Sequence, residues 1–227
     1  MATDDESGRF RQRRRTRAAI VGAAAELLQQ GRTPSINDIA DAADVSRRTV
    51  YLYFPTLDQL LLDATLGLLS QSAVDEAIDT ADVDGGDAGE RVDAMVRALA
   101  SMANETLPLG RSLIRLTVAA DAPVAPDVPD GGERRPRRGY RRIGWIERAL
   151  EPLRTQLSEA ELERLVSSLA MVVGWEALIV LQDLRGLAPD DQLATTQWAA
   201  RALIDAALAD HDASNAAKKR RSRSRSV

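Results

Sequence analysis

Residues 44–64 read DVSRRTVYLYFPTLDQLLLDA, and this stretch decides the fold. It places two Arg, two Tyr and a Phe within about two helical turns and then changes into a leucine-rich helical pattern. So many polar groups are rarely found together in a buried core, so we expect a short helix with a polar outer face. Such a face predicts a partner outside the protein core.

Two short helices are predicted around this stretch. Ser35, with Asp38 three residues later, resembles a capping box and predicts a helix at about 35–42. After a three-residue turn, Ser46 caps a second helix at 46–54. Two short helices joined in this way are typical of the helix-turn-helix motif. The apolar positions with the spacing to form its core are Ile36, Ile39, Ala40, Val45 and Val50.

Further helices flank this pair on both sides. An amphipathic helix is predicted at 13–30, ending at Gly31, and Thr56 after Pro55 caps a long helix that reaches about residue 78. Helical patterns continue at about 90–106, 110–120, 135–155, 158–185 and 189–210, with loops at 82–89 and 121–132. No stretch has the alternation of a strand, so the expected fold class is all-α.

Composition restricts the function classes. The chain has 227 residues, 44% of them hydrophobic, which is enough for a sizeable core. The lack of Cys excludes disulfides, thiolate metal sites and Cys nucleophiles and fits the cytoplasm. A single His, His211, and the absence of a phosphate-binding Gly-rich loop or a Gly-x-Ser-x-Gly elbow argue against an enzyme. We therefore predict no catalytic residues, no metal site and no cofactor.

No targeting or membrane segment is expected. The first ten residues, MATDDESGRF, are acidic and polar, unlike the basic and then apolar start of a signal peptide. No run of about 18 apolar residues occurs. The sequence thus favours a soluble, cytoplasmic protein without a membrane partner.

Charge is distributed unevenly along the chain. Residues 9–54 carry nine Arg against four acidic residues, whereas residues 55–217 carry fifteen Arg against 27 acidic residues. The segment 218–227 adds six positive charges. A basic end on an acidic body indicates that one end meets a polyanion. Ordinary solvated charge is the alternative interpretation.

The second short helix has the side chains to read DNA. In helix-turn-helix proteins this helix lies in the major groove with its N-terminal residues at the base edges. Arg47 and Arg48 stand there, and the planar fork of Arg matches guanine O6 and N7. Thr49 and Tyr51 can reach phosphates or a thymine methyl, and Tyr53 can hydrogen-bond a backbone oxygen. The predicted DNA-binding residues are Ser35, Ser46, Arg47, Arg48, Thr49, Tyr51, Tyr53 and Thr56.

A set of positions between residues 16 and 64 matches a known pattern. They are Ile20, Ala24, Leu27 and Gly31 in the first helix, Ser35 with Ile39-Ala40, Val45-Ser46, Thr49-Val50-Tyr51, Tyr53-Phe54 and Leu60-Leu61. This stretch resembles the DNA-binding domain of the tetracycline-repressor (TetR) family of bacterial transcription regulators. The rest of the chain resembles the family only in being helical.

The resemblance implies an all-α homodimer with two domains. A three-helix DNA-binding domain is expected at 13–55, and a helical effector-binding and dimerisation domain at 56–211. Residues 1–12 and 212–227 are predicted to be disordered tails. The dimer would form through the last two helices and read a pseudo-palindromic operator, with its recognition helices on the order of 34 Å apart. The family's commonest behaviour is repression that a small-molecule effector relieves.

Two positions depart from the family pattern. Arg48 stands where the family often has Gly, which implies an extra base or phosphate contact. Leu57 stands where the family commonly has a Lys that touches a phosphate. Leu57 cannot make that contact, which leaves Thr56 or the backbone amide at the helix start to replace it.

The helix predicted at 158–185 is apolar on more than one face, so it requires burial from two sides. Its own core can cover one side and a partner subunit the other. The helix at 189–210 carries small residues such as Ala199, Ala202 and Ala206, which suit a close four-helix dimer interface. A helix at the centre of a monomeric bundle is the alternative.

Six residues are candidate effector ligands: Met95, Met102, Leu113, Trp145, Trp175 and Glu176. The first four lie on helices that would line an effector cavity, yet such residues also serve as plain core. Glu176 interrupts an apolar run. There it could recognise a cationic or hydroxylated ligand from inside a pocket, or pair with an Arg at the dimer interface. The Arg-rich segment 133–148 is either a solvated face, a cover for acidic groups or a site for an anionic effector.

Three functions remain open from sequence. The first is a sequence-specific transcription regulator, as the resemblance implies. The second is a nucleoid-type binder of low specificity, which the Arg-rich segments 9–17 and 218–225 favour. The third is a TetR-fold module that binds small molecules without DNA, which Leu57 favours. The ratio of specific to nonspecific DNA affinity, roughly 10³ or more for a regulator, separates the first from the second.

Overall fold

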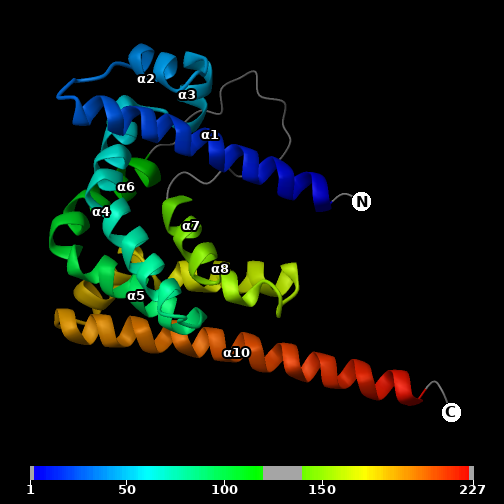
Figure 1. Ribbon diagram of the computed structural model, residues 1–227. Coiled ribbons are helices and arrows are strands. Elements are labelled where there is room, and N and C mark those ends of the chain that lie inside the picture. Colours follow the sequence, from blue (N-terminus) through cyan, green and yellow to red (C-terminus); the bar gives the residue numbers. More distant parts are fainter. Residues whose placement is uncertain (1–2, 120–139, 225–227) are drawn as a thin grey trace. The chain divides into compact units, whose positions relative to one another are not determined.

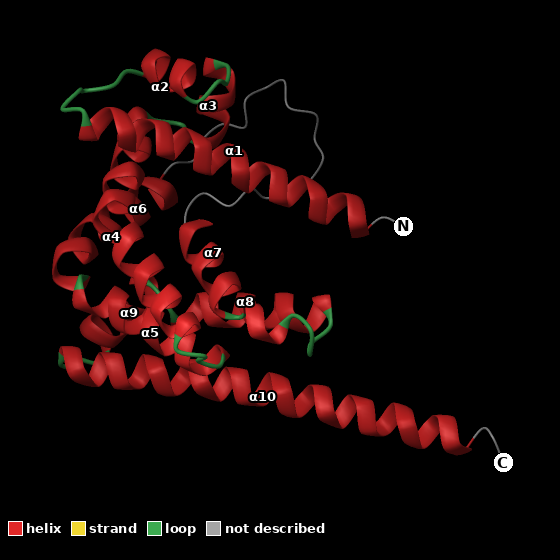
Figure 2. Cartoon of the chain, in the orientation of Figure 1, coloured by secondary structure: helices red, strands yellow, loops and turns green. Residues whose placement is uncertain are grey.

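The computed structural model describes residues 3–119 and 140–224, and every element within these ranges is a helix (Figures 1 and 2). The expected all-α class is therefore confirmed for the described part of the chain. The predicted loop at 121–132 lies outside the described residues, as does the start of the helix predicted at 135–155. The chain divides into two compact units, which are considered separately below.

The first unit comprises residues 1–71 and 104–140. Its elements are α1 (Thr3–Gln29), α2 (Ile36–Ala42), α3 (Arg47–Tyr53), the first half of α4 (Leu57–Val83) and nearly all of α6 (Ala103–Ala119). Its core joins Ile20, Ala24 and Leu27 of α1 to Ile36, Ile39 and Ala40 of α2, Val50 and Phe54 around α3, and Leu60 and Ala64 of α4. Four of the five predicted motif core residues are buried, and Val45 packs against them half-buried.

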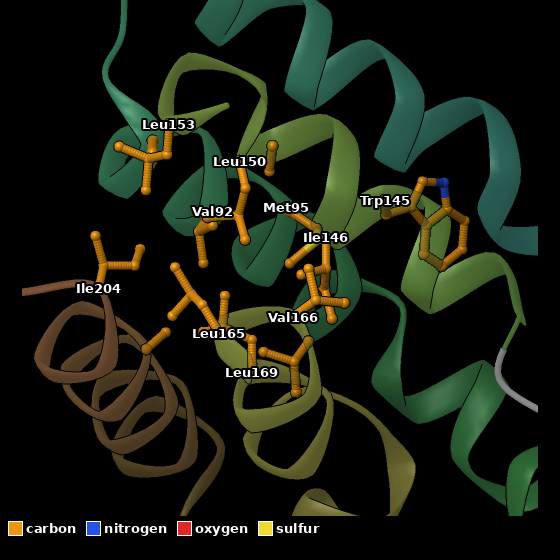
Figure 3. Close-up of a cluster of buried hydrophobic side chains, with 14 of the residues drawn as sticks. Val92, Met95, Trp145, Ile146, Leu150, Leu153, Leu165, Val166, Leu169 and Ile204 are labelled. Carbon is orange, nitrogen blue, oxygen red and sulfur yellow. The ribbon is translucent and has the colours of Figure 1, made fainter. Parts of the chain in front are cut away.

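The second unit comprises residues 72–103 and 141–227. It contains the second half of α4, α5 (Ala88–Ser101), α7 (Tyr140–Ala149) apart from its first residue, a short 3₁₀ turn η1 (Glu151–Leu153), α8 (Glu159–Val172), α9 (Trp175–Ile179), a π-helical turn η2 (Val180–Leu184) and α10 (Pro189–Ser224). Figure 3 shows its core, in which Val92 and Met95 of α5, Ile146 of α7, Leu165 and Leu169 of α8 and Ile204 of α10 meet.

The prediction of one continuous helix at 158–185 is wrong, because the helix is interrupted at Val173 and Gly174. Ser158 precedes α8 as its N-cap, and its side chain accepts the Glu161 backbone N–H. The Glu161 side chain in turn accepts the Ser158 backbone N–H, which completes a capping box. At Gly174 the backbone adopts φ 126°, a conformation that L side chains rarely take. Helical hydrogen bonding then resumes as α9 and η2. The predicted helices at 90–106 and 110–120 meet instead at Met102, so Pro108 lies inside α6.

The two ends of the chain differ from the prediction of disordered tails. α1 begins at Thr3 and α10 continues to Ser224, so helix covers most of 1–12 and 212–227. No Pro interrupts either stretch. The domain limits predicted near residue 55 stay a prediction, while the compact units group the first half of α4 and α6 with the helix-turn-helix.

Candidate nucleic-acid interface

Local capping fixes the start of α2. The Ser35 side chain accepts the Asp38 backbone N–H at 3.3 Å, and the Ser35 backbone N–H donates to Asp38 Oδ2 at 2.9 Å. The Ser35 hydroxyl also donates to Asp38 Oδ2 at 2.7 Å. These hydrogen bonds from Ser35, helped by the nearby charge of Arg32, lower the pKa of Asp38. Ser35 is thus engaged in a reciprocal capping box.

A tight turn and a second cap place α3. Asp44, in the turn between α2 and α3, has φ 51°, a conformation that Asp tolerates better than most residues. Ser46 then accepts the Thr49 backbone N–H at 3.0 Å, and the two hydroxyl oxygens lie 2.8 Å apart. The hydroxyl groups of Ser46 and Thr49 therefore serve the helix start.

The two faces of α3 have opposite characters. Val50 and Phe54 are buried in the core of the first unit. Arg47 and Arg48 are exposed in the first turn, and Tyr51 is 47% exposed one turn later. Two guanidinium groups and a phenol on the open face of a short helix form a surface able to hydrogen-bond base edges and phosphates.

The remaining predicted DNA residues lie at the end of α3 and the start of α4. Tyr53 is half-buried against the core. Thr56 is exposed, and its hydroxyl accepts the Gln59 backbone N–H at 3.2 Å, so it caps α4. Leu57 packs against the same core. The apolar side chain at position 57 therefore contributes to the core of the first unit.

Sequence reasoning missed one residue beneath this surface, Arg17. Its side chain is 4% exposed, and its guanidinium pairs with Asp63 at 3.3 Å. It also donates to the Tyr53 carbonyl at 3.3 Å and lies over the rings of Phe54 and Tyr140. The surrounding sequence RFRQRRRTR gave no signal that one Arg of this run is buried.

Comparison with known proteins agrees with this geometry. The family model for bacterial regulatory proteins, tetR family, matches residues 20–71. The chain carries a TetR-family domain. The match covers the C-terminal part of α1, all of α2 and α3 and the first half of α4. It ends at the same residue as the first segment of the first unit. No curated protein matches the chain. The match to the tetR family model indicates a DNA-binding transcription regulator.

Five of the six candidate effector residues lie in the second unit. Met95 is fully buried, and Met102 packs half-buried against the same core. Trp145, 7% exposed, donates from its indole N–H to Asp75 Oδ1 at 3.1 Å. Leu113 is buried in α6 and belongs to the first unit.

Trp175 and Glu176 are half-buried at the start of α9, beside the helix break. Arg142 of α7 donates from one guanidinium nitrogen to the Val173 carbonyl at 2.9 Å and to Glu176 Oε2 at 2.6 Å. Gly174 leaves room for this nitrogen, which lies 1.8 Å from where a Cβ would stand. Glu176 thus pairs with an Arg of its own chain, whereas the sequence-based alternatives are a ligand or an Arg at the dimer interface. Both of those alternatives stay predictions.

Two searches of the described residues bear on other functions. They hold no cluster of His, Asp or Glu able to bind a metal ion. One helical stretch, Glu159–Leu184, is long and apolar enough by composition to cross a membrane. Core and interface helices of soluble proteins meet the same criterion, and this stretch is broken at Gly174.

Proposed function

We propose that this protein is a sequence-specific, homodimeric transcriptional repressor of the cytoplasm whose DNA binding a small-molecule effector relieves. The observation that carries the proposal is α3, a capped two-turn helix with Arg47 and Arg48 exposed at its N-terminal end. The TetR-family match over residues 20–71 supports the DNA-binding part. The ligand, the dimer and the direction of regulation are parts of the proposal.

Arg47 and Arg48 are the residues that we propose to read bases. Both side chains are exposed, whereas Val50 on the same helix is buried in the core. Tyr51 and Thr56 are exposed and would bind phosphates, while Ser35, Ser46 and Thr49 support the interface through the caps that they form. Tyr53 would contribute through its half-buried ring and its hydroxyl.

Exposed apolar side chains support a dimer through the last helices. Met171 of α8 is 72% exposed, Leu184 of η2 78% and Trp198 of α10 73%. In the most apolar window of Glu159–Leu184, only 22% is buried within the protein. Such surface is costly in water, and a second copy would cover it. A two-fold dimer would present two α3 helices to a pseudo-palindromic operator.

An effector site in the second unit would draw on Met95, Met102, Trp145, Trp175 and Glu176. Leu113 belongs to the first unit and is not part of this proposed site. The ion pair of Arg142 and Glu176 could hold a polar group of the effector, because the two side chains are 18% and 35% exposed and Glu176 follows Trp175 directly. α4 runs from the first unit into the second, so it is the element through which an effector would act on α3.

The test is a selection followed by titration. Wild-type protein would enrich duplexes from a randomised library, and fluorescence anisotropy would compare the enriched duplex with unrelated DNA over a salt series. We expect a preference of roughly 10³ or more at physiological salt. Arg47→Ala should lower affinity for the enriched duplex by about 1–3 kcal/mol and relax one base position.

Other results would select the alternatives. Equal binding to all DNA that collapses with salt would indicate a nucleoid-type binder, as the Arg-rich segments favour. No binding to any DNA would indicate a small-molecule module and would make Leu57 the first position to change.

A further inference from the structure

Arg17 is buried in the first unit, which is unusual for an Arg side chain. It lies on α1, and 4% of its side chain is exposed. Arg is almost never buried without partners, because removing its charge from water costs several kcal/mol. The environment of its guanidinium group must therefore compensate that cost.

Polar partners come from two other helices. Arg17 pairs with Asp63 of α4 at 3.3 Å, and the Asp63 side chain is 7% exposed. Arg17 also donates to the backbone carbonyl of Tyr53 at 3.3 Å. Tyr53 is the last residue of α3, where carbonyl groups lack helical partners. One guanidinium thus joins α1, α3 and α4.

Two aromatic rings pack against the same group. The guanidinium carbon lies 4.2 Å from the centre of the Phe54 ring and 5.2 Å from that of Tyr140. Cation–π contacts of this kind are strongest where water is excluded. A Lys ammonium lacks the planar shape needed to stack on rings while bonding a carbonyl and a carboxylate in fixed directions.

We propose that Arg17 is a positioning residue for DNA recognition: it fixes the C-terminal end of α3 against α4 and Tyr140 and so sets the direction of Arg47 and Arg48. The inference rests on the proposed function. α3 has seven residues, too few to hold its own orientation, and Ser46 fixes only its first turn. Arg17 supplies the second point of attachment.

These contacts also assign Arg17 a place in regulation. Asp63 is on α4, and Tyr140 is the first residue of α7. Both helices continue into the second unit. A change that moves Asp63 or Tyr140 away from the guanidinium releases the end of α3. Arg17 is therefore where a displacement of α4 or α7 reaches the recognition helix.

The experiment compares Arg17→Lys with Arg154→Lys, in the full-length protein. Arg154 pairs with Glu151 on the surface of the second unit, so it controls for the exchange itself. The probes are the duplex that the wild type enriches and an unrelated duplex. Arg17→Lys keeps the charge, so we expect unchanged affinity for unrelated DNA and an unchanged salt slope. Affinity for the enriched duplex should fall at least tenfold, and Arg154→Lys should match the wild type.

A second selection with Arg17→Lys separates positioning from stability. Positioning predicts a broadened consensus at the bases read by Arg47 and Arg48, at a temperature where circular dichroism shows the variant folded. Tyr140→Leu removes one ring and keeps the ion pair. It should lose affinity for the enriched duplex several-fold while melting near the wild-type temperature.

Three results would overturn the inference. In the first, Arg17→Lys keeps the wild-type affinity and consensus. In the second, Arg17→Lys loses affinity equally for the enriched and the unrelated duplex. In the third, Arg17→Lys is unfolded, whereas Tyr140→Leu is folded and binds the enriched duplex normally. The last result would make Arg17 a stability residue only. If the wild type enriches no sequence, the proposed function fails as well, whereas enrichment with an unaffected Arg17→Lys refutes this inference alone.

Discussion

Replacing Gly174 with Ala should be among the most damaging single-methyl changes in the second unit. The added Cβ would stand 1.8 Å from a guanidinium nitrogen of Arg142 and 2.9 Å from its central carbon. The guanidinium would have to leave, and its hydrogen bonds to the Val173 carbonyl and Glu176 would be lost. The backbone at φ 126° would in addition be strained by any side chain.

The magnitude follows from these contributions. Backbone strain at such a φ costs about 1–3 kcal/mol. A hydrogen bond from a charged donor to the Val173 carbonyl contributes about 1.5 kcal/mol, and a partly exposed ion pair about 0.5 kcal/mol. Reduced freedom of the unfolded chain offsets about 0.5–1 kcal/mol. The free energy of unfolding should therefore fall by about 2–4 kcal/mol.

Gly186→Ala is the matched control. Gly186 also has a positive φ, 62°, but nothing lies within 4 Å of its absent Cβ. Gly186→Ala should lower the free energy of unfolding by about 1 kcal/mol, which is the cost of the backbone strain alone. Urea unfolding followed by circular dichroism, at a fixed protomer concentration, measures both variants.

Arg142→Ala completes the comparison. In the Arg142→Ala protein, Gly174→Ala should lower the free energy of unfolding less than it does in the wild type, because the guanidinium group that it would displace is absent. The reasoning is refuted if Gly174→Ala costs no more than Gly186→Ala, or if its cost is the same with and without Arg142.

Two further changes test charge at defined positions. Leu57→Lys should strengthen DNA binding, because the Lys stem can still cover the core while its ammonium reaches a phosphate. One added phosphate contact should steepen the salt slope by about 0.9 in the anisotropy assay, and an unchanged slope would show that residue 57 does not reach the DNA backbone. Hydrogen bonds from the Ser158 side chain and backbone, and then His211, lower the pKa of Glu161 from 4.5 to about 2. Glu161 therefore contributes stability above about pH 4.5 that is lost as the pH falls toward 2. Urea midpoints between pH 7 and pH 2.5 should decline less steeply in Glu161→Gln, and equal slopes would contradict the assignment.

The helix-turn-helix could be predicted because its signals are local. Ser35 with Asp38 and Ser46 with Thr49 form caps across three residues, and their hydrogen bonds are those that the sequence pattern indicates. The spacing of Ile36, Ile39 and Ala40 likewise depends only on helical periodicity. Local patterns of this kind survive folding unless tertiary contacts oppose them.

The features that sequence did not predict depend on distant partners. Gly174 lies in an apolar run that reads as a continuous helix, and its break is accompanied by Arg142, which is 32 residues away. Arg17 is one of several Arg in a basic run, and its burial depends on Asp63, 46 residues along the chain. The DNA and effector assignments stay predictions for a related reason, since their partners are other molecules.

The three Trp residues give the protein built-in optical labels. Trp145 is buried and donates its indole N–H to Asp75, so its emission should lie at short wavelength. Trp198 is 73% exposed, so it should emit at long wavelength and be open to a soluble quencher such as iodide. The proposed dimer through the last helices would cover Trp198, so dilution should increase its quenching while the emission of Trp145 stays constant. Formation of the proposed dimer can thus be tested with unmodified protein.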